Sequence, residues 1–527
     1  MKHIIKTQVL ELTIDQQLDA FDIQHRMSML YYNELLPALE KIFNAISDGD
    51  NDIIIDKLEL DLGVLAEKSF TDRDSIRQLI SSIEEQLQSA ASSKTAQQSS
   101  AHVIRRARPI SIFRQWIYYM QHGYLPWNAT PPDKKWLEQI LETVATDYNI
   151  SEELRQQIRH NAVIAERIAL QHDEIFLLHL TEVLTAKKQQ QLIAYVNEIA
   201  AIIKVAAIPS TQSFAGITEI QLRRRIWKTV LSTISTQAAA VVSTEAIATH
   251  IIESIFTPKE AAQLLQSKTV TAKLPLSLPL VSQLAKLPEA KKEAGKQTPS
   301  PAPKQEPPAA SVPQQKATSN PPSDPLQTGI QINITHNDQP AAANKTISNT
   351  DTPALAEQIT EEGIFVQHAG IVLLAPFIKP FFNNIGLLNN GKFTDENSTL
   401  KAISLLHYLA TGRSSSEEYE LVIPKLLCGI PLSACIDNHI ELNDQETSEA
   451  EELLTEAIAQ WEILKKTSNA GLRETFLQRP GKLFTRNDRP HLQVEAGPID
   501  MLLDYLPWNI SIIKLPWMKE YLQVEWR

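Results

Sequence analysis

The chain has 527 residues, of which 43% are hydrophobic and 21% charged, and its formal net charge is −12. These values are typical of a globular protein with room for about three domains, and the acidic balance argues against general nucleic-acid binding. Glu11 and Asp15 precede any apolar run of signal-peptide length, and no stretch approaches the ~18 apolar residues that span a bilayer, so we expect a cytoplasmic protein without a membrane span.

Residues 1–90 are predicted to form a first domain that begins with a β-α-β-α order. An extended segment opens it, and Pro37 then interrupts a helical segment, which predicts either two consecutive helices or one kinked helix. In the run NDIIIDKLELDLG, leucines alternate with Glu59 and Asp61, so one face is apolar and the other is solvated. This run predicts a half-buried strand, and a helix follows over residues 72–89.

Residues 102–256 combine an aromatic segment with a helical region. Six large aromatic residues lie between Trp116 and Trp136, a density typical of a core corner or of a contact surface. Beyond them, apolar clusters recur at helical spacing and predict four to six helices. The three arginines at residues 223–225 point in different directions around one of these helices, so we expect them to be solvated or paired with carboxylates.

Residues 257–362 are predicted to be a disordered linker rich in Pro, Ala, Gln and Ser. They contain no Phe, Trp or Tyr, and fourteen of the chain's thirty prolines lie between Pro275 and Pro353. Such a segment cannot bury enough apolar surface to offset the entropy lost when it becomes ordered. A tether of this kind suits a protein that joins two sites in a larger assembly better than it suits a catalyst.

Residues 363–527 are predicted to form an α+β domain. A strand at residues 364–367 leads into a helix that Pro376 and Pro380 should bend or divide, and the next helix should end at Gly412 in a left-handed cap. The predicted fold class of the whole chain is therefore α+β and predominantly helical.

The second half of this domain carries a helix-start signal and several strand signals. Ser448 and Glu451 fit an S-x-x-E capping box at the start of a helix. A hairpin is predicted about Asn487 and Asp488, and two more short strands are predicted within residues 509–527.

The sequence carries no recognisable catalytic or metal-binding pattern. It has no phosphate-binding loop, no H-E-x-x-H, no G-x-S-x-G and no dinucleotide-binding glycine motif. His407 lies alone in an apolar helix, and Cys428 and Cys435 lack a second pair at zinc-site spacing, so all three are expected to be core side chains. We therefore predict that the protein is not an enzyme and has no catalytic residue, cofactor or bound metal.

The tripeptide Leu-Pro-Trp occurs three times, at residues 125–127, 506–508 and 515–517. Proline fixes its own φ and lacks a donor just before a large ring, which suits an indole pinned in a core or one presented for docking. Both interpretations stay open. The candidate partner-binding residues are Trp116, Trp127, Trp508, Trp517, Met518 and Trp526.

Seven segments follow one another in an order that resembles a single family. Two lie in residues 1–130, IIIDKLELDLG and FRQWIYYMQHGYLPWN. The resemblance is closer in residues 363–527, where the segments are AGIVLLAPFIKPFFNNIGLL, KAISLLHYLATGR, ELVIPKLLCGIPL, GLRETFLQRPGKL and DYLPWNISIIKLPWM. Together they resemble the contractile injection system tape measure proteins of phage-tail-like particles.

This resemblance implies a structural protein that sets the length of the inner tube and organises its assembly. It would be cytoplasmic during assembly and then lie in the lumen of the particle, where its partners would be the inner tube, the spike or baseplate hub, the tube terminator and further copies of itself. The alternative is a cytoplasmic assembly chaperone or adaptor for hub or cargo proteins that is absent from the mature particle.

Overall fold

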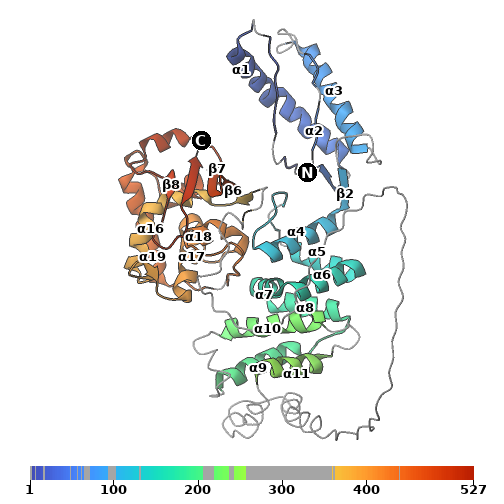
Figure 1. Ribbon diagram of the computed structural model, residues 1–527, viewed down its shortest axis with the longest axis vertical. Helices are drawn as coiled ribbons and strands as arrows, with labels where there is room; N and C mark the ends of the chain where they lie inside the picture. The colour runs from blue at the N-terminus through green and yellow to red at the C-terminus, as the bar shows by residue number, and fades with distance from the viewer. Residues whose placement is uncertain are drawn as a thin grey trace, which may run out of the picture.

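The structure is a computed structural model with three parts, which the colours of Figure 1 separate. They are an N-terminal arm that contains α1 to α3 (residues 20–92), a stack of helices from α4 to α11 (residues 108–255), and a C-terminal part over residues 363–526. It describes residues 3–5, 8–15, 18–47, 49–55, 57–60, 62–64, 72–92, 103–129, 132–133, 135–205, 219–236, 243–256, 359, 363–437 and 440–526. The linker predicted at residues 257–362 therefore lies outside the described residues, except for Ile359.

The N-terminal arm is a set of helices around a small core. α1 (Ala20–Leu30), the π-helical turn η1 (Tyr31–Leu35) and α2 (Leu36–Ile46) follow one another without a break, as expected for one helix interrupted near Pro37. This proline lies in the first turn of α2, where a missing N–H costs least. α3 (Arg73–Ser92) packs against α2. The core consists of Met27, Leu30, Leu35, Leu39, Ile42, Leu79, Ile83 and Leu87.

The predicted strand of this arm forms earlier in the chain than expected. β1 (Asn51–Ile55) pairs antiparallel with β2 (Val103–Ala107), and Ile53 lies opposite Arg105. The leucines of the LELDL run are partly buried against the helices, as predicted. The described residues of this run form no strand. The β-branched isoleucines at 53–55 suit a ladder better than leucines do. Because the described residues before Ala20 also form no strand, the observed order is α-β-α-β.

The helical stack buries one continuous core. Between Asp133 and Phe256 it has seven described helices instead of four to six, because Asp147 and Asn161 each accept hydrogen bonds from the next backbone N–H groups and start new helices. α10 packs against five other helices, and Trp227 at its centre is fully buried. The helices are α4 (Arg108–His122), α5 (Trp136–Thr146), α6 (Tyr148–His160), α7 (Ala162–Gln171), α8 (Glu174–Thr185), α9 (Leu192–Val205), α10 (Glu219–Thr236) and α11 (Thr244–Ile255).

The C-terminal part is α+β, as predicted. Its sheet has the order β3-β6-β7-β9-β8, with β7 and β9 parallel and the other pairs antiparallel. The strands are β3 (Ile364–Val366), β4 (Leu388–Asn389), β5 (Lys392–Phe393), β6 (Gly481–Arg486), β7 (Arg489–Val494), β8 (Ile512–Ile513) and β9 (Leu522–Trp526). The helices and 3₁₀ or π turns are η5 (Ala369–Leu374), α16 (Ala375–Asn384), α17 (Glu396–Thr411), η6 (Glu418–Glu420), α18 (Val422–Leu427), α19 (Asp444–Gln460), η7 (Glu462–Leu464), α20 (Asn469–Leu472), η8 (Arg473–Leu477) and η9 (Asp500–Tyr505).

Most local predictions for this part are confirmed. The helix with two prolines is divided into the 3₁₀ turn η5 and α16, and Gly412 caps α17 with φ 72°. Asn487 and Asp488, both with positive φ, join β6 to β7. The predicted capping box is wrong, because Asn443 and Glu446 form one earlier and α19 has already started when it reaches Ser448.

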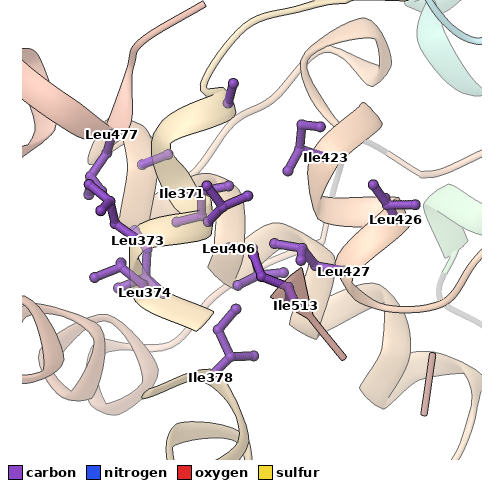
Figure 2. Close-up of a cluster of buried hydrophobic side chains, with 14 of the residues drawn as sticks. Ile371, Leu373, Leu374, Ile378, Leu406, Ile423, Leu426, Leu427, Leu477 and Ile513 are labelled. Atoms are coloured by element: carbon purple, nitrogen blue, oxygen red, sulfur yellow. The ribbon is translucent and has the colours of Figure 1, made fainter. Parts of the chain in front are cut away.

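The core of the C-terminal part lies between its helices and its sheet. Figure 2 shows Ile371, Leu373 and Leu374 of η5 beside Leu406 of α17, with Ile423 and Leu427 of α18 farther along. All are almost fully buried. Among the described residues, no helix is both long and apolar enough to cross a membrane.

Candidate functional site at the joint of the helical stack and the C-terminal part

The helical stack and the C-terminal part meet at a buried ion pair. Arg167 on α7 donates from Nε to Oε2 of Glu418 on η6 over 3.0 Å, although 251 residues separate the two positions. Both side chains are 0% exposed. We call the residues around this pair the joint, and Figure 1 shows α7 on the side of the stack that faces the C-terminal part.

A second cation completes the charge arrangement of the joint. Lys425 Nζ lies 2.6 Å from Oε1 of Glu418, so one carboxylate faces two buried cations. Backbone carbonyls accept further hydrogen bonds from both cations: Arg167 donates to the oxygens of Met120 and Ser433, and Lys425 to those of Leu432 and Ala434. Burial lowers the pKa of Lys425, and Glu418 offsets part of that shift. A buried charge is tolerated only when it is paired and hydrogen-bonded in this way.

Neutral side chains and a second ion pair extend the joint on both sides. Gln171 of α7 donates to the Ile436 carbonyl over 2.7 Å and accepts from the Glu418 backbone N–H over 3.4 Å. Arg224 of α10 pairs with Asp437, and both side chains are buried. The joint therefore takes its stack residues from α7 and α10 and its C-terminal residues from the segment 418–437.

The aromatic segment of the stack lies against the joint. The ring of Tyr119 meets that of Tyr419 edge to face, with centroids 5.5 Å apart, and Tyr124 is buried within the core of the C-terminal part. Gly123, between them, caps α4 with φ 83°. A Cβ at Gly123 would lie 2.7 Å from Oε1 of Glu418, so the close approach also requires glycine. The dense aromatics are thus both core and contact surface, and the contact is within the chain.

The same turn η6 carries a second buried carboxylate. Glu420 faces away from the joint toward His368 and His407, and Arg413 Nη2 lies 2.5 Å from its Oε1. Burial alone would raise the pKa of Glu420, but the two histidines, a backbone N–H and the Arg413 guanidinium hold it well below its usual range. His407 is a buried histidine as predicted, although it does not lie alone.

Three of the predicted partner-binding residues serve the cores. Trp116 is fully buried and donates from Nε1 to His172 Nε2 over 3.1 Å. Trp517 donates to the Leu427 carbonyl over 2.7 Å, and the buried Met518 accepts from the backbone N–H of Leu515. Their contacts favour the structural interpretation.

The other three lie nearer the surface. Trp127 is half-buried in the segment that follows α4 in the sequence. Trp508 and Trp526 line one hollow of about 220 Å³, whose other walls include Leu503 and Val524. Trp508 also donates to the Leu373 carbonyl over 2.9 Å, so only part of its ring is available to a partner. Met501, Tyr505 and Ile512, each within two positions of a lining residue in the sequence, are 64–66% exposed.

Sequence reasoning missed the charged residues of the joint. Arg167 stands within VIAERIAL and Lys425 within LVIPKLLC, both strongly apolar runs. A lone cation on an apolar face indicates a buried partner, which is the signal that could have found them. For the arginine triplet, carboxylate pairing is confirmed at Arg223, which contacts Glu174, and at Arg224.

Comparison with known protein families gives a match over nearly the whole chain. The family model described as contractile injection system tape measure protein matches residues 2–526. No curated protein and no solved structure matches this chain.

Proposed function

Because this chain belongs to the contractile injection system tape measure protein family, we propose that it is a non-enzymatic tape measure and assembly protein that sets the length of the inner tube. It would link the spike or baseplate hub to the growing tube and lie in the tube lumen. The observation that carries the proposal is the family match over nearly the whole chain. Folding domains at residues 1–90, 102–256 and 363–527, separated by a linker at 257–362, belong to the same proposal.

The joint limits how such a protein can measure length. While Arg167 and Glu418 remain paired, both ends of the predicted linker belong to one closed body. If drawn out at roughly 3.1 Å per residue, about 106 linker residues would span about 330 Å, whereas a flexible coil of the same length would average ~60 Å. A linker whose ends are held together cannot set a distance of that size. We therefore propose that the joint is closed before assembly and opens when the two ends engage different components of the tube.

The exposed apolar residues of the C-terminal part mark its docking surface in this proposal. The exposed residues Met501, Tyr505 and Ile512 each lie within two positions, along the chain, of a residue that lines the hollow with Trp508 and Trp526. Contiguous apolar side chains on a folded surface are typical of protein contacts. The proposed partner is a particle component, either the hub at one end of the tube or the terminator at the other.

One observation favours a second function, that of an assembly chaperone or adaptor that leaves before the particle is complete. The longest unbroken helical run among the described residues, α1 to α2 over residues 20–46, spans only about 40 Å. A closed body with short helices suits transient binding of hub or cargo proteins. Quantitative mass spectrometry of purified particles separates the two functions, because an adaptor would be missing or far below one copy per tube.

The experiment that tests the ruler function changes the length of the linker. Deletion or insertion of thirty residues within 260–355 should shorten or lengthen the tube by up to about 90 Å, measured by electron microscopy. The matched control is a scrambled linker of unchanged length, which should give tubes of the parental length. Unchanged tubes in both length variants would reject the linker as the ruler and leave the helical stack as the element that sets length.

A further inference from the structure

Three metal-ligating side chains meet inside the C-terminal part. His368 follows β3, His407 lies on α17 and Glu420 lies on η6, so the fold brings together three separate elements. His407 Nε2 lies 3.2 Å from Glu420 Oε2, and His368 Nε2 lies 3.8 Å from Glu420 Oε1. One ligand atom from each residue lies within 4.8 Å of the other two. All three side chains are buried.

We propose that His368, His407 and Glu420 bind one divalent transition-metal ion, with zinc as the expected ion. Two imidazoles and one carboxylate are a donor set that zinc accepts, with a fourth position left for water or another ligand. Ligands at about 2.0–2.2 Å from a tetrahedral ion lie roughly 3.3 Å from one another. His407 Nε2 and Glu420 Oε2 already have this separation, whereas His368 Nε2 needs to approach Glu420 Oε1 by about half an ångström and also to lie closer to His407 if their ligand atoms are 4.8 Å apart.

The His368 side chain provides independent evidence for a ligand at this position. Its side chain is only 11% exposed, yet neither Nδ1 nor Nε2 has a hydrogen-bond partner. A buried polar group without a partner costs about 1–3 kcal/mol, so native proteins rarely leave one. A metal ion on Nε2 would satisfy the ring at the nitrogen that faces Glu420.

Arg413 decides whether an ion can enter. Its Nη2 contacts Glu420 over 2.5 Å and lies 3.4 Å from His407 Nε2, so the guanidinium competes with a cation for the same oxygen. The Arg413 side chain is 49% exposed and can move into solvent, whereas the three ligands cannot. Arg413 thus forms the mouth of the site, and removal of its charge should favour the metal.

Metal binding would also affect the joint, because it would fix the turn that carries Glu418. Glu420 and Glu418 lie on the same 3₁₀ turn, with Glu420 facing the histidines and Glu418 facing Arg167. An ion that fixes Glu420 therefore fixes the backbone from which Glu418 extends. We expect zinc to raise the midpoint of thermal unfolding of the full chain, because a ligand that binds only the folded state stabilises it.

The test titrates zinc into the full-length, chelator-treated protein against a chromogenic indicator, and repeats the titration with cobalt to record the absorption of a tetrahedral site. The parent should bind one tight equivalent above the weak binding of its other histidines. His368→Gln should reduce this affinity at least tenfold, while His491→Gln, a buried histidine of the same part outside the cluster, should leave it unchanged. Arg413→Ala should bind zinc more tightly than the parent.

Two results would overturn the proposal. One is zinc binding by the parent that equals that of a folded His368→Gln variant. The other is weaker binding by Arg413→Ala, which would show that the cluster is a closed ion-pair network with Arg413 as its permanent cation. His368→Gln is the decisive variant because its ring has no hydrogen bond to lose, and circular dichroism verifies its fold. The test does not depend on whether the protein measures tubes.

Discussion

Glu418 lies at the buried ion pair between the two folded parts. Its carboxylate lies between Arg167 and Lys425, and all three side chains are essentially unexposed. A buried ion pair adds little compared with an apolar contact, but removal of one partner leaves uncompensated charge and is costly. The joint therefore gives the contact its specificity more than its strength.

Glu418→Gln should lower the free energy of unfolding by about 3–5 kcal/mol, because two cations would remain buried without a counter-charge. Urea denaturation at neutral pH measures the change. Glu462→Gln is the matched control, since Glu462 is 84% exposed in its pair with Lys465, and it should change stability by less than about 0.5 kcal/mol. A loss below 1 kcal/mol for Glu418→Gln would contradict the account of the joint.

Gly123→Ala tests the close approach of α4 to Glu418. In this variant, alanine must adopt a left-handed backbone conformation, which costs about 1 kcal/mol, and its Cβ clashes with the Glu418 carboxylate. Gly386→Ala is the control, because Gly386 has φ 74° and nothing within 4 Å of the added Cβ. We expect Gly123→Ala to be the more destabilising of the two in thermal unfolding, and equal losses would show that the joint tolerates the methyl group.

His172 gives the stack a defined pH dependence. Burial lowers its pKa from 6.5 to about 4, and its Nε2 accepts from Trp116 only while unprotonated. The unfolded chain therefore binds the extra proton first as the pH falls, so stability present above pH 6.5 is lost progressively toward pH 4, by up to about 3 kcal/mol. His172→Gln should flatten this part of the stability profile. Exposed His160→Gln should not, and identical profiles for the parent and His172→Gln would refute the assignment.

At the scale of elements, the sequence predicted helix ends and turns correctly where the residues at the turn alone determine them. Gly412 ends α17 because only a left-handed residue closes that turn, and the hairpin residues Asn487 and Asp488 take positive φ for the same reason. The predicted start of α19 was wrong because the sequence holds two capping-box patterns in succession, and the helix starts at the earlier one, formed by Asn443 and Glu446. β1 lies earlier in the chain than the predicted strand because its partner β2 comes from a distant segment, which the sequence did not identify as a strand.

The candidate site could not be predicted for a related reason. Arg167 and Glu418 are 251 residues apart, and neither segment carries a sequence feature that identifies the other as its partner. The metal-ligating cluster likewise joins His368, His407 and Glu420 from elements whose packing is set by the core in Figure 2. Sequence spacing identifies pairs on one helix or strand, whereas these contacts depend on tertiary packing.

The turn η9 and its neighbours give a prediction about docking. Tyr505→Ala, at a side chain that is 65% exposed, should leave stability within about 0.5 kcal/mol and reduce incorporation into particles, measured by mass spectrometry. Trp508→Ala should instead destabilise the protein by about 3 kcal/mol, since its ring packs against Phe377 and Trp461. Normal incorporation of a folded Tyr505→Ala variant would place the docking surface elsewhere.

At the scale of the whole molecule, the joint turns a chain with two folded ends into one closed body. The family match indicates a tape measure protein, and the structure adds that its ends contact each other through buried charge. A closed state before assembly would keep the linker from spanning two sites too early. Assembly would then depend on components that compete with the joint for the two ends.

The most direct test of this account cuts the chain between its two folded parts. A specific protease site inserted near residue 313 allows the linker to be cleaved in the purified protein, and size-exclusion chromatography at about 10 μM then shows whether the fragments separate. We predict that the fragments of the parent elute together, whereas those of Glu418→Gln elute apart. Separate elution of the parental fragments would show that the joint does not hold the two parts together and would contradict the account.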